Sequence, residues 1–201
     1  MNGSVFSLAV DGRGNLYAGG QFTTAGGVSA NHIAKWDGAS WSALGSGMSG
    51  TTVLALAFDS SGNLYAGGDF NTAGGNRAIG IAKWNGSTWS ELGLGASWVY
   101  ALAVDGGGNI YAGGNFVGTG GFNNRGTAKW DGTSWSTLGS GMNSNVYSLA
   151  IDGNNLYAGG DFTTAGGVSA NHIAKWNGAL IGVMTIQSFL PLITRVFGGG
   201  W

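Results

Sequence analysis

One nine-residue segment occurs four times in this chain of 201 residues, and it constrains the fold more than any other feature. The copies read GNLYAGGQF, GNLYAGGDF, GNIYAGGNF and NNLYAGGDF, and their tyrosines, at positions 17, 65, 111 and 157, are 48, 46 and 46 residues apart. Self-similarity at such a period is typical of repeat proteins, in which each unit buries its apolar face against the next one. The chain is therefore predicted to contain four units rather than one conventional domain.

Each repeat contains the pattern of four short strands. The first is an alternating apolar run that ends at an aspartate, in residues 5–11, 53–59, 99–105 and 146–152. A turn of Gly and Asn leads to Asn-Leu-Tyr-Ala-Gly-Gly, whose paired glycines indicate a bend or the close approach of a neighbouring backbone. A third strand ends in Asp-Gly or Asn-Gly, a strong hairpin signal, and a fourth begins at a Trp. Four antiparallel strands in about 47 residues predict one blade of a β-propeller.

The same residues resemble known repeat families. A strand ending in Tyr-x-Gly-Gly, an aromatic residue at the end of the third strand and a Trp five residues later resemble the kelch motif over residues 5–178. Trp-Asp-Gly-x-x-Trp-Ser-x-Leu-Gly and Asn-Leu-Tyr-Ala-Gly-Gly-x-Phe are similar to glycine-rich propeller repeats of bacterial surface proteins related to fungal cortical polarity markers. The resemblance implies an all-β fold of four kelch-like blades. Because kelch-like propellers include both binding scaffolds and galactose oxidases, it implies no single function.

The fourth repeat departs from the pattern at its end. We expect the propeller to span residues 1–186, with blades at about 5–52, 53–98, 99–145 and 146–186, and an apolar tail at 187–201. Counting from Asn177, we expect Ile181 in the place of the fourth-strand Trp and Met184 in the place of the following Leu. The tail is expected to pack against the propeller or a second copy. A membrane span and an aberrant gene end are the alternatives, although the uncharged run is shorter than the roughly 20 residues that a span needs.

Four is the smallest number of blades in the usual range of propellers. An arc of four blades that stayed open would expose an apolar blade face at each end. We therefore expect either closure within one chain or completion of a larger ring by oligomerisation, for which two arcs related by a two-fold axis are the simplest arrangement.

Composition excludes several functions. Charged residues make up 8% of the chain and the net charge is −1, so no nucleic acid partner is expected. Because there is no cysteine, disulfides, thiolate metal sites and the Tyr–Cys crosslink of a galactose oxidase are excluded. Neither a Gly-x-Ser-x-Gly elbow, a phosphate loop nor a His-Glu-x-x-His motif is present, so we expect no enzyme, no cofactor and no metal. Because the first residues carry neither a basic region nor an apolar core, we expect no signal peptide among them.

Several repeated side chains could carry chemistry, but each has a structural interpretation. The aspartates that end the first strands are expected to cap their turns, because the further carboxylates of a calcium loop are missing. The lysine of each third strand is expected to pair with an aspartate or extend over a Trp, rather than act as a base. The tryptophans are expected to pack in the core or between blades rather than stack on sugars, with Trp98 outside the pattern. Two histidines, without clustered carboxylates, do not predict a metal site.

We expect a non-enzymatic binding or scaffold module, outside the cell or at its surface, with a protein or carbohydrate ligand. The variable loops between the second and third strands and between successive blades are the expected recognition face. The candidate residues are Asn31, His32, Arg77, Asn124, Arg125, Asn171 and His172. One alternative is a self-assembling ring or filament that uses blade edges and the tail. Another is a hydrolase or lyase with carboxylates in a central channel.

Overall fold

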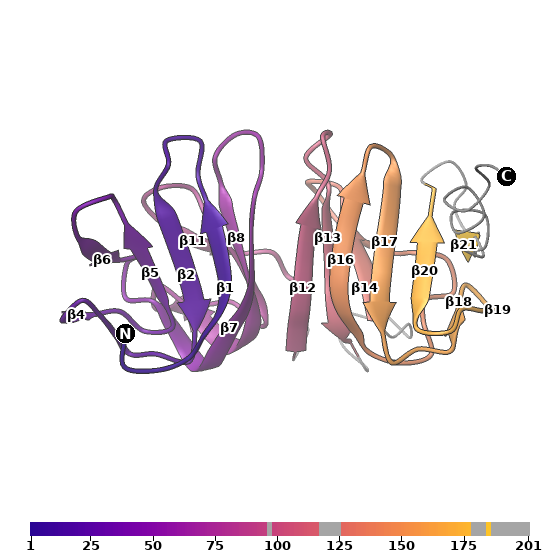
Figure 1. Ribbon diagram of the computed structural model, residues 1–201, viewed down its shortest axis with the longest axis horizontal. Coiled ribbons are helices and arrows are strands. Elements are labelled where there is room, and N and C mark those ends of the chain that lie inside the picture. The colour runs from indigo at the N-terminus through magenta and orange to yellow at the C-terminus, as the bar shows by residue number, and fades with distance from the viewer. Residues whose placement is uncertain (96–97, 117–125, 178–183, 186–201) are drawn as a thin grey trace, which may run out of the picture.

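The computed structural model describes residues 1–95, 98–116, 126–177 and 184–185. Every regular element in these ranges is a β-strand, and none of them contains a helix that could cross a membrane. Four antiparallel sheets stand beside one another as blades (Figure 1). The prediction of a four-bladed β-propeller is therefore confirmed.

Each blade is a four-stranded meander in chain order from its inner to its outer strand. Blade 1 consists of β1 (Val5–Val10), β2 (Leu16–Gly20), β5 (Ile33–Trp36) and β6 (Trp41–Ala43). Blade 2 consists of β7 (Met48–Phe58), β8 (Leu64–Ala73), β10 (Ile81–Trp84) and β11 (Trp89–Glu91), with β9 (Asn76–Arg77) paired to β8. Blade 3 consists of β12 (Trp98–Val104), β13 (Ile110–Asn115), β14 (Gly126–Trp130) and β15 (Trp135–Thr137). Blade 4 consists of β16 (Val146–Asp152), β17 (Asn155–Gly160), β20 (Ile173–Trp176) and β21 (Met184–Thr185).

Two loops are more regular than the sequence predicted. The connection after β2 contains a small hairpin of β3 (Thr24–Ala25) and β4 (Val28–Ser29), and blade 4 has its counterpart in β18 (Thr164–Ala165) and β19 (Val168–Ser169). The β3–β4 turn is Gly26-Gly27, and both residues have left-handed φ angles, of 54° and 84°. In blade 2 the β7–β8 ladder continues through register shifts near Gly50, so β7 begins at Met48 rather than at Val53.

The fourth blade does close with an unusual fourth strand, but its expected register is wrong. Met184 pairs with Trp176, as Trp41 pairs with Trp36 in blade 1. Met184 therefore takes the position of the Trp and not that of the Leu, while Ile181 lies outside the described residues. The reason is loop length, because the connection between β20 and β21 is longer than the tight turn of the other blades, and loop length sets hairpin register. The expected tail at 187–201 also lies outside the described residues.

Consecutive blades pack through one repeated contact. Val53, Val99 and Val146, which lie on the inner strands β7, β12 and β16, are completely buried. Each lies against a glycine of the preceding blade: a Cβ added to Gly19 would lie 2.5 Å from Cγ1 of Val53. The close approach predicted from the paired glycines is thus confirmed, since Gly19 makes room for the next blade and Gly20 lies against the backbone of Ser4 in its own blade.

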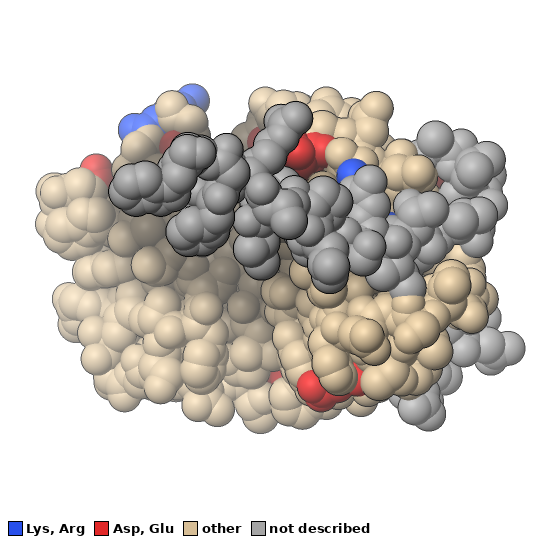
Figure 2. Space-filling view, turned by 45° about the vertical axis from the view of Figure 1, so that its right-hand side comes forward, with Lys and Arg blue, Asp and Glu red and all other residues tan. Residues whose placement is uncertain are grey.

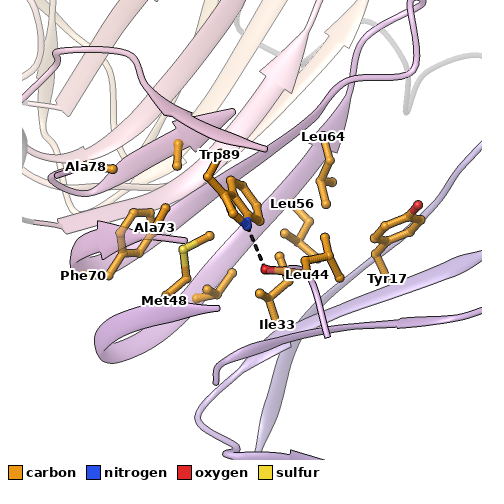
Figure 3. Packing of buried hydrophobic residues seen from close by; sticks show 13 residues of the cluster. Tyr17, Ile33, Leu44, Met48, Leu56, Leu64, Phe70, Ala73, Ala78 and Trp89 are labelled. Atoms are coloured by element: carbon orange, nitrogen blue, oxygen red, sulfur yellow. Dashed lines mark hydrogen bonds between the residues drawn. The ribbon is translucent and has the colours of Figure 1, made fainter. Parts of the chain in front are cut away.

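The Trp that begins the outer strand of blades 2 and 3 completes this packing. Figure 3 shows Trp89 of blade 2 among Leu44 of blade 1 and Leu56 and Leu64 of its own blade. Its indole Nε1 donates a hydrogen bond to the Leu44 carbonyl at 2.9 Å. Trp135 of blade 3 donates in the same way to the Leu92 carbonyl at 2.7 Å. Packing between blades, as predicted for the tryptophans, is therefore confirmed for these two.

Candidate functional site

The turn that follows the inner strand is organised by one aspartate in blades 1 to 3. Asp59 accepts hydrogen bonds from the backbone N–H groups of Ser61 and Asn63, from the Asn63 side chain at 2.7 Å, and from the hydroxyl of Tyr65 at 3.0 Å. Asp11 and Asp105 accept the corresponding set in blades 1 and 3. The turn-capping role predicted for these three aspartates is confirmed. Blade 4 has a shorter turn, in which neither Asn155 nor Tyr157 donates such a bond to Asp152.

These hydrogen bonds shift the pKa values of both partners. Burial alone would raise the pKa of Asp59, but the bonds from Asn63, Tyr65 and Ser61 outweigh it, and the pKa is lowered. The same balance lowers the pKa values of Asp11 and Asp105. Burial, together with the charge of Asp11 and the hydrogen bond to it, raises the pKa of Tyr17 to about 12. The aspartates are therefore ionised and the tyrosine hydroxyls protonated at neutral pH.

The repeated lysine of each third strand lies above a tyrosine ring. Nζ of Lys35, Lys83 and Lys129 is 5.7 Å from the ring centroid of the tyrosine in its own blade, and Nζ of Lys175 is 5.6 Å from that of Tyr157. The lysines do extend over an aromatic ring, but the prediction of a Trp is wrong, because the ring is the repeated Tyr. In the described ranges the one ion pair is between Arg77 and Glu91, at 3.5 Å, so no described carboxylate neutralises these lysines directly.

Aspartate, tyrosine and lysine of one blade meet the third-strand Trp of the next blade in a polar pocket. The pocket between blades 1 and 2 has a volume of about 640 Å³, that between blades 2 and 3 about 380 Å³, and that between blades 3 and 4 about 290 Å³. We call these three the inter-blade pockets. Their shared lining is Asp11, Tyr17, Lys35 and Trp84 in the first, Asp59, Tyr65, Lys83 and Trp130 in the second, and Asp105, Tyr111, Lys129 and Trp176 in the third.

The inter-blade pockets are lined in part by the turns that follow the inner strands, and these turns lie at the upper end of the molecule in Figure 1. In Figure 2, Lys, Arg, Asp and Glu residues are sparse over the visible part of the face; several of them lie along the same upper rim, and an acidic patch lies at the lower edge. Sequence reasoning assigned each of these side chains separately to a structural role. The signal it missed was the constant spacing of Asp, Tyr, Lys and Trp in successive repeats, which places them around one pocket.

In the described chain, the candidate residues predicted from sequence lie in the variable loops at the end of the molecule opposite the turns that line the inter-blade pockets. Asn31 is a connector between blades, because its side chain donates to the Ser46 carbonyl at 3.1 Å and its own carbonyl accepts from the Met48 N–H at 3.0 Å. His32 has a left-handed φ of 65°, at the position that Gly80 occupies in blade 2 with a φ of 71°. Asn171 and His172 are also left-handed, with φ angles of 34° and 69°.

Of the remaining candidates, only Arg77 lies in the described part of the chain. Arg77 is exposed on β9, where it pairs with Glu91, and Asn124 and Arg125 lie outside the described residues. Within the described chain, no hydrogen bond or ion pair joins one candidate residue to another, and no three side chains of metal-binding type come together. A recognition site in these loops stays a prediction.

Four antiparallel sheets, joined by one contact that recurs between successive blades, define the chain as a β-propeller repeat protein. Over residues 1–151 the chain matches the family model described as the Rax2 C-terminal beta propeller domain. It therefore belongs to this family, and the resemblance to repeats related to cortical polarity markers is confirmed. No curated protein matches the sequence.

Solved structures of similar fold differ widely in sequence. The computationally designed Ika8 protein matches with a TM-score of 0.54 at 17% identity, over 90% of this chain and 48% of that one. A domain described as the extracellular part of a hybrid two-component system of B. thetaiotaomicron matches with a TM-score of 0.55 at 16% identity, over 87% of this chain and 22% of that one. The extracellular domain of a one-component system of B. thetaiotaomicron matches with a TM-score of 0.52 at 14% identity, over 79% of this chain and 20% of that one. At these identities the likeness shows the fold alone, and the chain spans less than half of each protein.

Proposed function

We propose that this chain is a non-enzymatic binding module that acts outside the cell or at the cell surface, and that its inter-blade pockets hold the ligand. One observation carries the proposal: the same four side chains line the pocket at each of the three boundaries between blades. A packing role explains the tyrosine and the Trp, but it does not require a polar pocket at every boundary. The extracellular setting is supported by the two bacterial domains of similar fold that are described as extracellular.

The chemistry of the pockets favours a neutral ligand with several hydroxyl groups, and we propose a carbohydrate. The lysine ammonium donates hydrogen bonds, the aspartate oxygens and the turn carbonyls accept them, and the Trp supplies an apolar ring. Three pockets with the same four side-chain types in one chain would bind a repeating glycan with an avidity above that of a single pocket.

The state of the ionisable groups supports binding rather than catalysis. The carboxylates already accept bonds from their own turns, which lower their pKa values, and the tyrosine hydroxyls donate to these carboxylates. A general acid or base has a pKa near the working pH. Neither the aspartates, whose pKa values are lowered, nor the tyrosines, whose pKa values are raised, meet this condition.

The test is binding of the full chain to an immobilised panel of oligosaccharides, followed by calorimetric titration of each ligand found. The triple variant Lys35→Met, Lys83→Met and Lys129→Met keeps the apolar stems over the tyrosines but removes the ammonium groups, and we expect it to weaken binding at least tenfold. Arg77→Met, a matched loss of charge at the loop face, is expected to leave binding unchanged. No binding of the unaltered chain to any glycan at millimolar concentration would overturn the carbohydrate assignment. Loss of binding in Arg77→Met alone would instead support the loop face.

A further inference from the structure

The contact between blades has two halves, one supplied by each blade. The following blade supplies a Val and, three residues later, a Leu on its inner strand, and the preceding blade supplies the glycine that they cover. Val53 and Leu56 cover Gly19, Val99 and Leu102 cover Gly67, and Val146 and Leu149 cover Gly113. The contact is thus made three times within the chain, by the same residue types each time.

Blade 1 exposes one half of this contact. Val5, Leu8 and Val10 of β1 occupy the positions of Val53, Leu56 and Phe58 of β7. Val5 is 40% exposed, Leu8 60% and Val10 59%, whereas Val53 is 0% exposed and Leu56 9%. Residues 5–10 include no charged side chain. The described structure thus leaves an apolar strip on β1 that has no covering blade.

Blade 4 exposes the other half. Gly159 occupies the position of Gly19, but the only described atoms near a Cβ built on it are Ser148 Oγ and the carbonyl oxygen of His172, both from blade 4 itself. Tyr157 is half-buried, whereas its counterpart Tyr17 is buried under blade 2. The described structure therefore leaves this glycine and tyrosine without the covering side chains that they have in blades 1 to 3.

Blades 1 and 4 share a serine on the inner strand where blades 2 and 3 have an alanine. Ser7 Oγ accepts a hydrogen bond from the backbone N–H of Leu56 in blade 2 at 3.0 Å. Ser148 is its counterpart in blade 4, because Ser7 pairs with Gly19 and Ser148 with Gly159, whereas blades 2 and 3 have Ala55 and Ala101 there. The counterpart of the Leu56 N–H is the N–H of Leu8. An incoming blade 1 would therefore offer Ser148 the donor that Ser7 already has.

We propose that a second copy of this chain completes the ring: β1 of each copy packs on blade 4 of the other, around a two-fold axis. A copy related in this way supplies both missing halves at once and leaves no apolar blade face open, so the assembly is closed. The residues of the junction are Val5, Leu8 and Val10 from one copy and Tyr157, Gly159 and Ser148 from the other. This inference is independent of the ligand proposed above.

Native mass by light scattering of the full chain is the first test, and the expected mass is twice the chain mass of 20.3 kDa. Leu8→Asp places a charge in the junction and is expected to give a monomer with the circular dichroism spectrum of the unaltered chain. The matched control is Val28→Asp, since Val28 is 40% exposed on the small outer hairpin and lies outside the junction. We expect the control to remain dimeric. A monomeric unaltered chain, or an open series of larger species, would overturn the closed dimer.

Cross-linking tests the geometry of the junction, and it is unambiguous because the chain has no cysteine. At the internal counterpart, a Cβ on Gly19 lies 3.2 Å from Cβ of Val53, near the roughly 3.5–4.5 Å of a disulfide. Val5→Cys protein mixed with Gly159→Cys protein under mild oxidation is therefore expected to give a disulfide-linked dimer. The double variant Gly19→Cys, Val53→Cys is the positive control and is expected to form its disulfide within one chain.

The same variants distinguish two other ways in which the exposed faces of blades 1 and 4 could be covered. If the double variant Val5→Cys, Gly159→Cys formed its disulfide within a monomer, four blades would close on themselves and the proposal would fail. The full chain could instead be a monomer that becomes a dimer when residues 187–201 are deleted. That result would mean that the tail covers a blade face in the full chain, and the proposed dimer of the full chain would be wrong.

Discussion

At the scale of single residues, the aspartate at the end of the inner strand in blades 1 to 3 organises a turn and lines a pocket. Each of Asp11, Asp59 and Asp105 satisfies two backbone N–H groups, an amide side chain and a tyrosine hydroxyl. Hydrogen bonds to a charged group contribute more to stability than neutral ones, about 1.5–3 kcal/mol each. The bond to the hydroxyl also orients the tyrosine ring that lies under the lysine.

We expect Asp59→Ala to lower the free energy of unfolding by about 2–4 kcal/mol, because several donors would lose their partner at once. Asp152→Ala is the matched control, since the shorter turn of blade 4 makes none of the corresponding side-chain bonds, and its effect is expected to be below about 1 kcal/mol. Urea unfolding followed by tryptophan fluorescence measures both. Equal losses in the two variants would show that the hydrogen bonds of the turn contribute little.

At the scale of elements, the outer strand of a blade connects that blade to the preceding one. Trp89, on β11, is 4% exposed and donates across the boundary to the Leu44 carbonyl. The hydrogen bond adds to the apolar packing between the two sheets and to other bonds across the boundary, such as that from the Leu56 N–H to Ser7 Oγ. Trp41, the counterpart in blade 1, has no described blade before it, and its indole N–H makes no hydrogen bond to described residues.

Trp89→Phe is expected to cost about 2–4 kcal/mol of stability, because the buried Leu44 carbonyl keeps only the Gly47 N–H as a donor and the smaller ring leaves a cavity. Trp41→Phe is the control, and it is expected to cost less than half as much. Thermal unfolding of both variants, followed by circular dichroism, compares their losses of stability. If the two melting temperatures fell by the same amount, the bond across the boundary would not be a determinant of blade packing.

At the scale of the whole molecule, each blade contacts only its neighbours, so stability is expected to be a sum of blade and boundary contributions. The inner strands β7 and β12 have a blade on both sides, whereas β1 and β16 have one on a single side within the described chain. In the proposed dimer all four inner strands are covered. Loss of the dimer would therefore affect the first and last blades most.

Amide hydrogen exchange is expected to show this directly. In the Leu8→Asp variant, we expect the amides of β1 and β16 to exchange at least tenfold faster than in the unaltered chain, while those of β7 and β12 change less than threefold. Mass spectrometry of peptides from the four inner strands gives the comparison. Equal acceleration in all four strands would mean that the chain unfolds as one unit and that its boundaries do not contribute separately.

The sequence alone determined the number of blades, the four strands in each blade and the role of the turn aspartates. These features depend on interactions close together in the chain: alternation along a strand, Asp-Gly and Asn-Gly turns, and bonds from Asp11 to Arg13, Asn15 and Tyr17. Repetition strengthened each local signal, since the same pattern occurred four times. The register of β21 could not be predicted, because the repeat pattern ends at Asn177 and loop length, not residue type, sets the pairing.

Only the tertiary structure decided what lies between the blades. The aspartate, tyrosine and lysine of one repeat meet the Trp of the next at a boundary that no single repeat contains, so the pockets appear only when two blades are in place. The same holds for the exposure of β1 and Gly159. Val5 and Val53 belong to the same sequence pattern, yet one is 40% exposed and the other buried, because burial depends on whether a neighbouring blade is present.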